Sequence, residues 1–186
     1  MSEQGEQRTD TSPAVIEALG EEQARRYLPD LAALLRDAVL GGDSVGFLPP
    51  FPVEESRAYW QSILPDITQR RRVLLAALRD GRLLGSVQLE LGAKPNAIHR
   101  AEIQKLLVLT TARSQGLGRL LMRAAERHAQ SLARSLLVLD TQTGSVAHGL
   151  YLRLGYTEAG SIPDYALSPD GPQPTTILYR RLTALA

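Results

Sequence analysis

A short stretch with two glycines and two arginines, ARSQGLGRLL, combines the residue types that bind an anion. An amphipathic helical pattern begins at about Gly116, so Gly116 and Gly118 fall in the first turn of a helix. The N–H groups of a first turn have no partner within the helix, and the helix dipole makes this end positive. Without a Cβ, the glycines let a phosphate approach these N–H groups, and Arg113 and Arg119 add positive charge. We therefore expect residues 113–119 to hold a pyrophosphate.

This stretch is also compatible with roles other than pyrophosphate binding. Glycine serves ordinary strand-to-helix turns as well. A Walker A loop is excluded, because no GxxxxGK followed by Ser or Thr occurs in the chain. The dinucleotide-binding fingerprint remains a minor alternative, since GLGRLL starts as GxG and Asp140 follows about twenty residues later. Against it, Leu121 occupies the position of the third glycine.

Composition narrows the function classes. Twenty-one basic and 20 acidic residues give a net charge of +1, which predicts no broad attraction to nucleic acid or to an anionic membrane. The absence of cysteine excludes disulfides, thiolate nucleophiles and cysteine metal sites, and three scattered histidines predict no metal site. Because no apolar run has the length of a signal peptide or membrane span, we expect a cytoplasmic protein.

Hydrophobic periodicity and turn residues predict the elements that position the anion-binding stretch. Residues 1–12 are polar and aperiodic, which indicates a disordered tail, and residues 13–186 are expected to form one domain. Asp80 and Gly81 favour the turn of an antiparallel hairpin over residues 73–92. Helices are expected at residues 21–40, 53–63, 116–132 and 145–154, and further strands at residues 15–19, 102–109, 135–140, 157–162 and 175–182.

Three details of these elements bear on the candidate site. The continuously apolar strand at residues 135–140 is expected to be covered on both faces and to run parallel to residues 102–109, because a helix connects the two. Three prolines stiffen the apolar segment at residues 45–53, which is predicted to be either a lid or a plain connector. The buried stripe of the helix after Gly116 is expected to contain Leu117, Leu120, Leu121, Ala124, Ala125, His128 and Leu132.

Two motifs in order resemble the GNAT superfamily of acetyl-CoA-dependent N-acetyltransferases. Arg113, Gly116 and Gly118 match its Q/RxxGxG/A motif. The segment AHGLYLRLGY matches its AxxxYxxxG(F/Y) motif through Ala147, Tyr151, Gly155 and Tyr156. More narrowly, SVGFLPPF, QKLLVL, LDTQTGSVA, YTEAGSIPDYA and PDG resemble the tabtoxin resistance acetyltransferases. Two positions depart from the broader pattern: Ser114 replaces a common glycine, and Gly144 replaces an asparagine that contacts CoA in many members.

The resemblance implies an α/β fold with a mixed, mostly antiparallel sheet, whose central parallel pair splays apart and is flanked by helices. It also implies acetyl-CoA as co-substrate, without a metal. The pantetheine arm is expected to enter the gap between the parallel strands, beyond their carboxyl ends. The residues expected to contact the cofactor are Leu107, Val108, Leu109, Arg113, Ser114, Gln115, Gly116, Leu117, Gly118, Arg119, Ser145 and His148.

A chain without cysteine cannot form a cysteine thioester, so direct attack by the acceptor amine in a ternary complex is the expected mechanism. A strand N–H near Val108 is the expected donor to the developing oxyanion. Tyr151 is the candidate acid for the leaving thiolate, since a phenol of pKa ~10 is reasonably matched to a thiol of about 8.5. Its alternative role is packing on the sheet. Asp140 and Glu102 are the candidate bases, or else ordinary strand-end carboxylates.

The acceptor is expected to be the amine of a small molecule, of toxin or antibiotic type. Phe47, together with Asp164 and Tyr165 between the final two strands, is a candidate substrate-binding residue. A protein or peptide N-acetyltransferase and a CoA-binding module without turnover are the alternatives, and a homodimer is compatible with the sequence. The arginine run at residues 70–72 is interpreted as a solvated surface, with contact to a nucleotide phosphate as the alternative.

Overall fold

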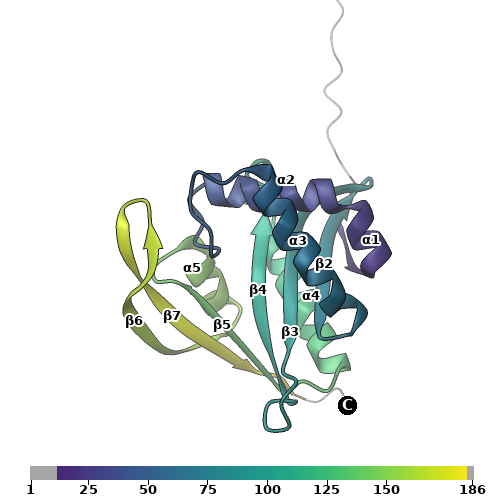
Figure 1. Cartoon of the computed structure of the whole chain (residues 1–186). Helices are drawn as coiled ribbons and strands as arrows, with labels where there is room; N and C mark the ends of the chain where they lie inside the picture. Colours follow the sequence, from purple (N-terminus) through teal and green to yellow (C-terminus); the bar gives the residue numbers. More distant parts are fainter. Residues whose placement is uncertain (1–11, 184–186) are drawn as a thin grey trace, which may run out of the picture.

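The computed structural model describes residues 12–183, so the predicted tail lies outside the described residues except for Ser12 (Figure 1). Every described strand belongs to one sheet of seven strands, in the order β1-β2-β3-β4-β5-β7-β6. The strands are β1 (Val15–Leu19), β2 (Arg72–Arg79), β3 (Arg82–Leu91), β4 (Arg100–Val108), β5 (Leu136–Gln142), β6 (Thr157–Ser168) and β7 (Gly171–Arg181). The α-helices are α1 (Glu21–Arg26), α2 (Leu28–Leu40), α3 (Val53–Thr68), α4 (Leu117–Ser131) and α5 (Val146–Arg153).

Two apolar cores lie on opposite faces of this sheet. Leu31, Leu35 and Trp60 of α2 and α3 pack on one face, against β2 and β3. Leu121 and Tyr151, from α4 and α5, belong to the core on the other face. Figure 1 shows α2 and α3 in front of β2, β3 and β4, and α4 behind them. The mixed α/β architecture expected from the sequence is therefore confirmed.

The strands β4 and β5 form the only parallel pair among the described strands, and their pairing is short. It joins Arg100 to Leu136, Ala101 to Leu137 and Glu102 to Val138. Beyond this point β4 continues to Val108 beside β3, while β5 continues to Gln142 beside β7. The two strands therefore part on the side where their carboxyl ends lie. The prediction of a parallel pair that splays is confirmed.

Several predicted bounds were wrong. The helix expected at residues 21–40 is two helices, because Pro29 fits only in the first turn of α2 and the chain breaks at Tyr27. The helix α3 continues past residue 63, through Pro65 to Thr68. On β5, Leu137 and Leu139 are buried but Asp140 is exposed, so only one face of this strand is fully covered.

The last two strands form a hairpin much longer than expected. Strand β6 continues through Pro163 to Ser168, so Asp164 and Tyr165 lie within a strand and not between strands. Because β6 is an edge strand, Pro163 removes no hydrogen bond from a second neighbour. The pairing with β7 is irregular between Ile162 and Ala166, and Asp164 has a φ of 53° there. The candidate substrate residues thus sit on an exposed bulge.

The buried side of α4 is rotated relative to the predicted stripe. Leu117, Leu121 and Ala125 are buried, but Leu120 is 46% exposed and Leu132 is 39% exposed. Their expected places in the core are filled by Met122, Glu126 and Ala129. Glu126 is buried because Arg123 and Arg180 each donate to its carboxylate at 2.9 Å, which fixes α4 to β7. The prediction placed only apolar residues and His128 on the buried side of this helix, and so it missed the charged residue Glu126.

The neighbouring leucines of α4 give a matched test of this orientation. Leu121→Ala should lower the free energy of unfolding by about 3 kcal/mol, because it leaves a cavity between α4 and the sheet. Leu120→Ala should change it by less than about 0.5 kcal/mol. Urea unfolding followed by circular dichroism measures both values. Equal losses in the two variants would contradict this orientation of the helix.

Candidate functional site

The N-terminus of α4 presents a run of free backbone N–H groups. Gly116 is the N-cap residue with a φ of 79°, and Ser114 has a φ of 63°. Within residues 12–183, no N–H group from Ser114 to Arg119 donates a hydrogen bond. A Cβ on Gly116 would meet nothing within 4 Å, so the space in front of this turn is open. Consecutive free N–H groups in such a turn form a concave site for an anion.

The two arginines and the second glycine of this stretch have different environments. The side chain of Arg113 donates to Asp43 Oδ2 at 2.6 Å and to the carbonyl oxygen of Val108 at 3.3 Å. Arg119 is exposed. A Cβ on Gly118 would lie 3.2 Å from Leu150 Cδ2, so this glycine lets α4 approach α5 closely. Gly118 therefore has a packing role in addition to the one predicted from the motif.

The backbone of β4 offers polar groups to the opening between β4 and β5. Leu109 donates its N–H to the carbonyl of Leu84 on β3 at 2.9 Å. Because successive N–H groups of a strand point to opposite sides, the N–H of Val108 faces away from β3, toward the opening. Leu107 pairs with Ser86 of β3, and its side chain is buried. Of the three predicted backbone contacts, Val108 has the orientation needed.

Three charged side chains gather on the sheet face that carries α2 and α3. Asp140 shares this face with Glu102, because Leu137 and Leu139 point into the core on the other side. Burial lowers the pKa of Lys105, and the positive charge of Arg72 adds to the shift. The negative charges of Asp140 and Glu102 oppose it, which places both carboxylates within electrostatic reach of the ammonium.

A buried polar network lies beside these charges and was not predicted. Arg72, only 9% exposed, donates to Gln88 and Gln104 at 2.7 Å and to Glu90 at 2.6 Å. Gln104 in turn donates to Glu102 Oε1 at 2.9 Å. The interpretation of residues 70–72 as solvated surface is wrong for Arg72, whose side chain is drawn in by these acceptors. The missed signal was the presence of long polar residues within three neighbouring strands: Arg72 in β2, Gln88 and Glu90 in β3, and Gln104 in β4.

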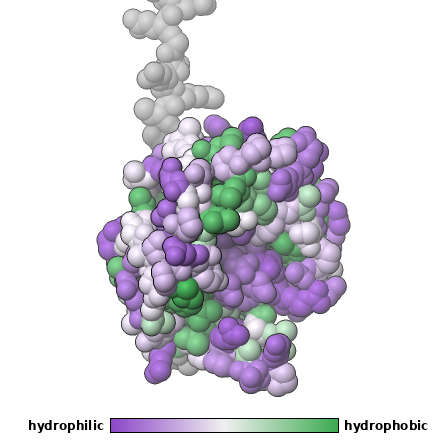
Figure 2. Space-filling model, turned by 60° about the vertical axis from the view of Figure 1, so that its left-hand side comes forward, coloured by the Kyte–Doolittle hydropathy of each residue, from purple (hydrophilic) through white to green (hydrophobic). Residues whose placement is uncertain are grey.

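Aromatic rings border the same face. Phe47 packs against Phe51 and Tyr59, with ring centroids 4.7 and 5.5 Å away. Lys105 Nζ lies 5.2 Å from the ring centroid of Tyr59 and 5.7 Å from that of Phe47. Phe51 is buried, which anchors the proline-rich segment to the core. Figure 2 shows a recess bordered by hydrophilic residues on the side of the molecule where β6 and β7 come forward.

Helix α5 carries the candidate acid. Tyr151 is buried, and its ring lies 5.8 Å from that of Tyr156. Burial raises the pKa of the Tyr151 phenol well above its usual value, and the negative charge of Asp140 raises it further. The phenol is therefore protonated throughout the neutral pH range. The role of Tyr151 in catalysis stays a prediction.

The polar residues at the start of α5 are linked to one another by hydrogen bonds. Ser145 Oγ accepts from the His148 N–H at 3.1 Å, and His148 Nδ1 accepts from the Gly144 N–H at 3.0 Å. His148 Nε2 lies 2.8 Å from Glu158 Oε1, so the neutral ring carries its proton on Nε2. Both ring nitrogens are thus occupied. Contacts of Ser145 and His148 with a cofactor stay predictions.

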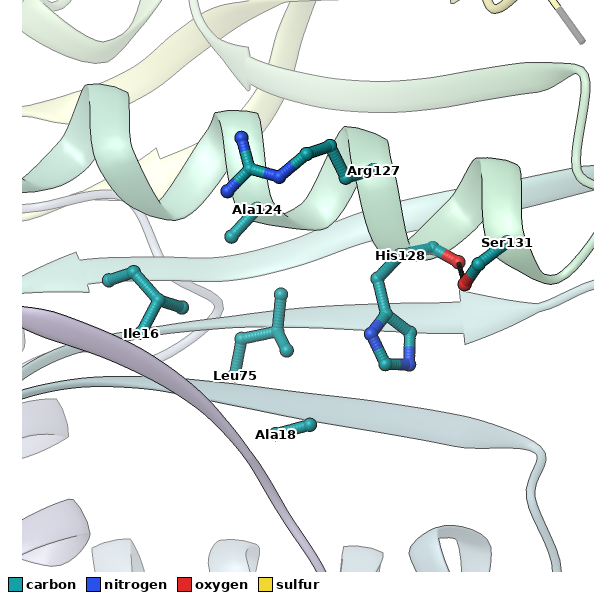
Figure 3. A pocket seen from close by; sticks show the side chains of 7 residues that line it. All are labelled: Ile16, Ala18, Leu75, Ala124, Arg127, His128 and Ser131. Atoms are coloured by element: carbon teal, nitrogen blue, oxygen red, sulfur yellow. Dashed lines mark hydrogen bonds between the residues drawn. The ribbon is translucent and has the colours of Figure 1, made fainter. Parts of the chain in front are cut away.

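Other described residues contribute less to a site. The side chains of Asp164 and Tyr165 are exposed and make no hydrogen bond, ion pair or ring contact with another described residue. A shallow depression between α4 and strands β1 and β2 lies on the opposite sheet face, with the His128 side chain at one end (Figure 3). In residues 12–183 no cluster of three potential metal ligands occurs, and no helix is long and apolar enough to span a membrane.

The motif loop and the splayed strands fit one family. A sequence model of the acetyltransferase (GNAT) family matches residues 37–156, more than half of the chain. The chain belongs to this family. GNAT members are acetyltransferases that use acetyl-CoA, so the general activity is acetyl-CoA-dependent N-acetylation. The dinucleotide-binding alternative is wrong, because that fold needs a largely parallel sheet and β4 with β5 is the one parallel pair in the described sheet.

Solved structures share the GNAT fold over nearly the whole chain. A ribosomal-protein-alanine N-acetyltransferase from Brucella melitensis is 19% identical with a TM-score of 0.75, covering 90% of this chain and 99% of its own. YncA from Salmonella typhimurium, solved with its cofactor acetyl-CoA, is 15% identical with a TM-score of 0.76, covering 94% and 97%. A protein described as a phosphinothricin N-acetyltransferase is 18% identical with a TM-score of 0.76, covering 91% and 99%. At these identities the likeness shows the fold alone.

Two neighbouring arginines test the buried network. Arg72→Met should lower the free energy of unfolding by about 3 kcal/mol, because it leaves Glu90 and two glutamines without their shared donor. Arg71→Met should cost less than about 1 kcal/mol, since the bond from Arg71 to Asp66 is exposed. Chemical denaturation gives both values. If Arg72→Met lowers the free energy of unfolding no more than Arg71→Met does, the buried hydrogen bonds of Arg72 add nothing to stability.

Proposed function

We propose that this GNAT protein acetylates the amine of a small molecule of toxin or antibiotic type, by direct attack of the amine on acetyl-CoA in a ternary complex. The observation that supports the proposal most is the separation of β4 from β5 after three paired residues. The resulting opening has free N–H groups at the start of α4 and two carboxylates, of Glu102 and Asp140, on the adjoining sheet face.

The residues present fit acetyl-CoA, which supplies an acetyl group on a thioester. The free N–H groups of residues 114–119 and the side chain of Arg113 suit a pyrophosphate. Val108 has a backbone N–H directed toward the opening, which suits it to stabilise negative charge on a carbonyl oxygen. Leu107 and Leu109 pair with β3 and serve to hold Val108 in this orientation.

Asp140 is the better candidate to take the proton from the acceptor amine. Its side chain is exposed and makes no hydrogen bond with another described residue, whereas the side chain of Glu102 accepts from Gln104. A free carboxylate accepts a proton directly or through one water. In this assignment Glu102 attracts the positive charge of the incoming ammonium.

Tyr151 is assigned as the donor to the leaving sulfur. Its raised pKa keeps the phenol protonated. The same shift makes the phenol a weaker acid than a reference phenol of pKa about 10, so it is less well matched to a thiol of pKa about 8.5 than the sequence suggested. Its contribution is therefore a hydrogen bond that stabilises the developing negative charge on the sulfur.

A small acceptor is favoured over a protein acceptor by the rings beside the opening. Phe47 and Tyr59 pack over Lys105 and narrow the face on which Glu102 lies. The relative described as a phosphinothricin N-acetyltransferase and the segments resembling tabtoxin resistance enzymes support the same class. Asp164 and Tyr165 are retained as acceptor contacts from the β6 and β7 hairpin.

A panel of amines, scored by release of free CoA thiol, tests the proposal. Because the chain has no cysteine, the protein adds no thiol background. Small amines should be acetylated faster than peptides, and initial-rate lines against both substrates should intersect. Faster acetylation of peptide N-termini would point to a protein acceptor. Binding of acetyl-CoA without turnover of any amine would point to a silent module.

Two glycines with the same strain separate the anion-binding loop from backbone effects. Gly116→Val places a branched side chain before the free N–H groups and should weaken acetyl-CoA binding at least tenfold, about 1.4 kcal/mol. Gly81→Val, in the β2–β3 turn, introduces the same change at a φ of 77°, near the 79° of Gly116. Calorimetric titration should find the acetyl-CoA affinity of Gly81→Val unchanged. Unaltered affinity in folded Gly116→Val would remove this loop from the cofactor site.

Two tyrosines with touching rings separate chemistry from packing. Tyr151→Phe should lower kcat by roughly 10²-fold, the lower end of the range for general acid catalysis, and leave acetyl-CoA affinity nearly constant. Tyr156→Phe should retain kcat, and because the buried Tyr156 hydroxyl has no partner, stability should not fall. The measurement is kcat on the best amine of the panel. If Tyr151→Phe keeps more than a third of the activity, water protonates the leaving thiolate.

A further inference from the structure

Lys105 is one of only two lysines in a chain that otherwise uses arginine for its basic side chains. The other, Lys94, is exposed in the loop between β3 and β4. An arginine side chain stays protonated, whereas a lysine can lose its proton and act as a nucleophile. The single lysine on the sheet face beside the β4–β5 opening is therefore chemically unlike every other basic residue there.

The backbone of β4 directs Lys105 out of the regular strand. The pairing with β3 is irregular between Ser86 and Gln88, opposite Gln104 and Leu107, and Lys105 has a φ of 48°. A residue with a Cβ occupies this left-handed region only where its surroundings hold it. The bulge sits three residues before Val108, the proposed donor to the thioester carbonyl, which limits the distance between their Cα atoms to at most about 10 Å.

The amine of Lys105 is not committed to another group. Its Nζ lies over the rings of Phe47 and Tyr59, and it forms no hydrogen bond or ion pair with any described residue. The charged groups that act on it are Arg72 from β2, Glu102 from β4 and Asp140 from β5. Burial and the charge of Arg72 lower its pKa, so a larger share of the amine is neutral than for an exposed lysine.

We propose that Lys105 is a self-acetylation site, at which the protein transfers acetyl from acetyl-CoA to its own Nζ when no acceptor is bound. The inference rests on the proposed function, since it uses the same opening and the same carboxylates. It assigns to Lys105 the place of an internal acceptor amine.

The transfer is balanced without another reactant. The Lys105 ammonium gives a proton to the carboxylate of Asp140 or Glu102, and the neutral Nζ forms a bond to the thioester carbonyl carbon. The carbon–sulfur bond breaks with its electron pair on sulfur, and the thiolate takes up the second proton that the nitrogen releases, so the products are CoA and N-acetyl-lysine. This amide is stable, so it is an end state and not an intermediate in acetylation of other amines. The charge over Phe47 and Tyr59 is lost in the product.

Site-resolved mass spectrometry of the full chain, incubated with acetyl-CoA and no amine, tests this inference. Lys94 is the internal reference for uncatalysed acetylation. Lys105 should be acetylated roughly a hundredfold faster than Lys94, within the range for general acid–base catalysis, and excess free CoA should suppress only the Lys105 reaction. With acetic anhydride, which needs no CoA site, the exposed Lys94 should react at least as fast as Lys105. Lys105→Arg keeps the charge and should leave Lys94 as the only acetylated lysine, formed at its slow rate.

Calorimetric binding of acetyl-CoA and CoA release with the amine panel, on the same preparation, separate this inference from the proposed function. If the protein binds acetyl-CoA and acetylates an amine but Lys105 reacts no faster than Lys94, self-acetylation is overturned and the proposed function stands. Preference for Lys105 with both reagents, insensitive to free CoA, would show reactivity of the amine alone and would also overturn the inference. Failure to bind acetyl-CoA overturns both.

Discussion

The short parallel contact between β4 and β5 is the constraint on which the rest of the structure depends. Only three residue pairs join the two strands, yet each strand is held firmly on its other side, β4 by β3 and β5 by β7. The sheet is therefore continuous at one end of these strands and open at the other, where each strand still pairs with its outer neighbour. Helix α4, which connects the strands, begins at the open end, so its unpaired N–H groups lie where β4 finishes.

The two faces of the sheet differ in how many polar side chains they bury. Under α4 and α5 the core is almost wholly apolar, and the carboxylate of Glu126, buried there, accepts from two arginines. On the other face the apolar core beneath α2 and α3 gives way to Arg72, Gln88 and Gln104, each bonded to a neighbour. The hydrogen bonds from Arg72 link three neighbouring strands, and they leave Glu102 beside the opening.

Sequence patterns predicted the elements well where one physical signal dominated. The Asp80-Gly81 turn, the parallel pair and the helix after Gly116 followed from turn chemistry, a connecting helix and a first-turn motif. The errors arose where tertiary contacts override local preference. The strand predicted to end before Pro163 continues to Ser168, because an edge strand tolerates a proline. Leu120 was expected in the core because it is apolar, but it is exposed, and Glu126 is buried on the core side of α4 instead. Lys105 was missed because its position at a bulge, over two rings from a distant segment, has no counterpart in a sequence motif.

The bond between Arg113 and Asp43 joins the turn before α4 to the segment that follows α2. Both side chains are partly exposed, so the pair is open to competition from another anion. A phosphate that recruits Arg113 exchanges one anionic partner for another, and the net gain in free energy is the difference between the two contacts. The same exchange leaves Asp43 without its cation and removes one contact between the turn before α4 and the segment that follows α2. A ligand at the start of α4 would therefore compete with a contact that holds the segment after α2 in place.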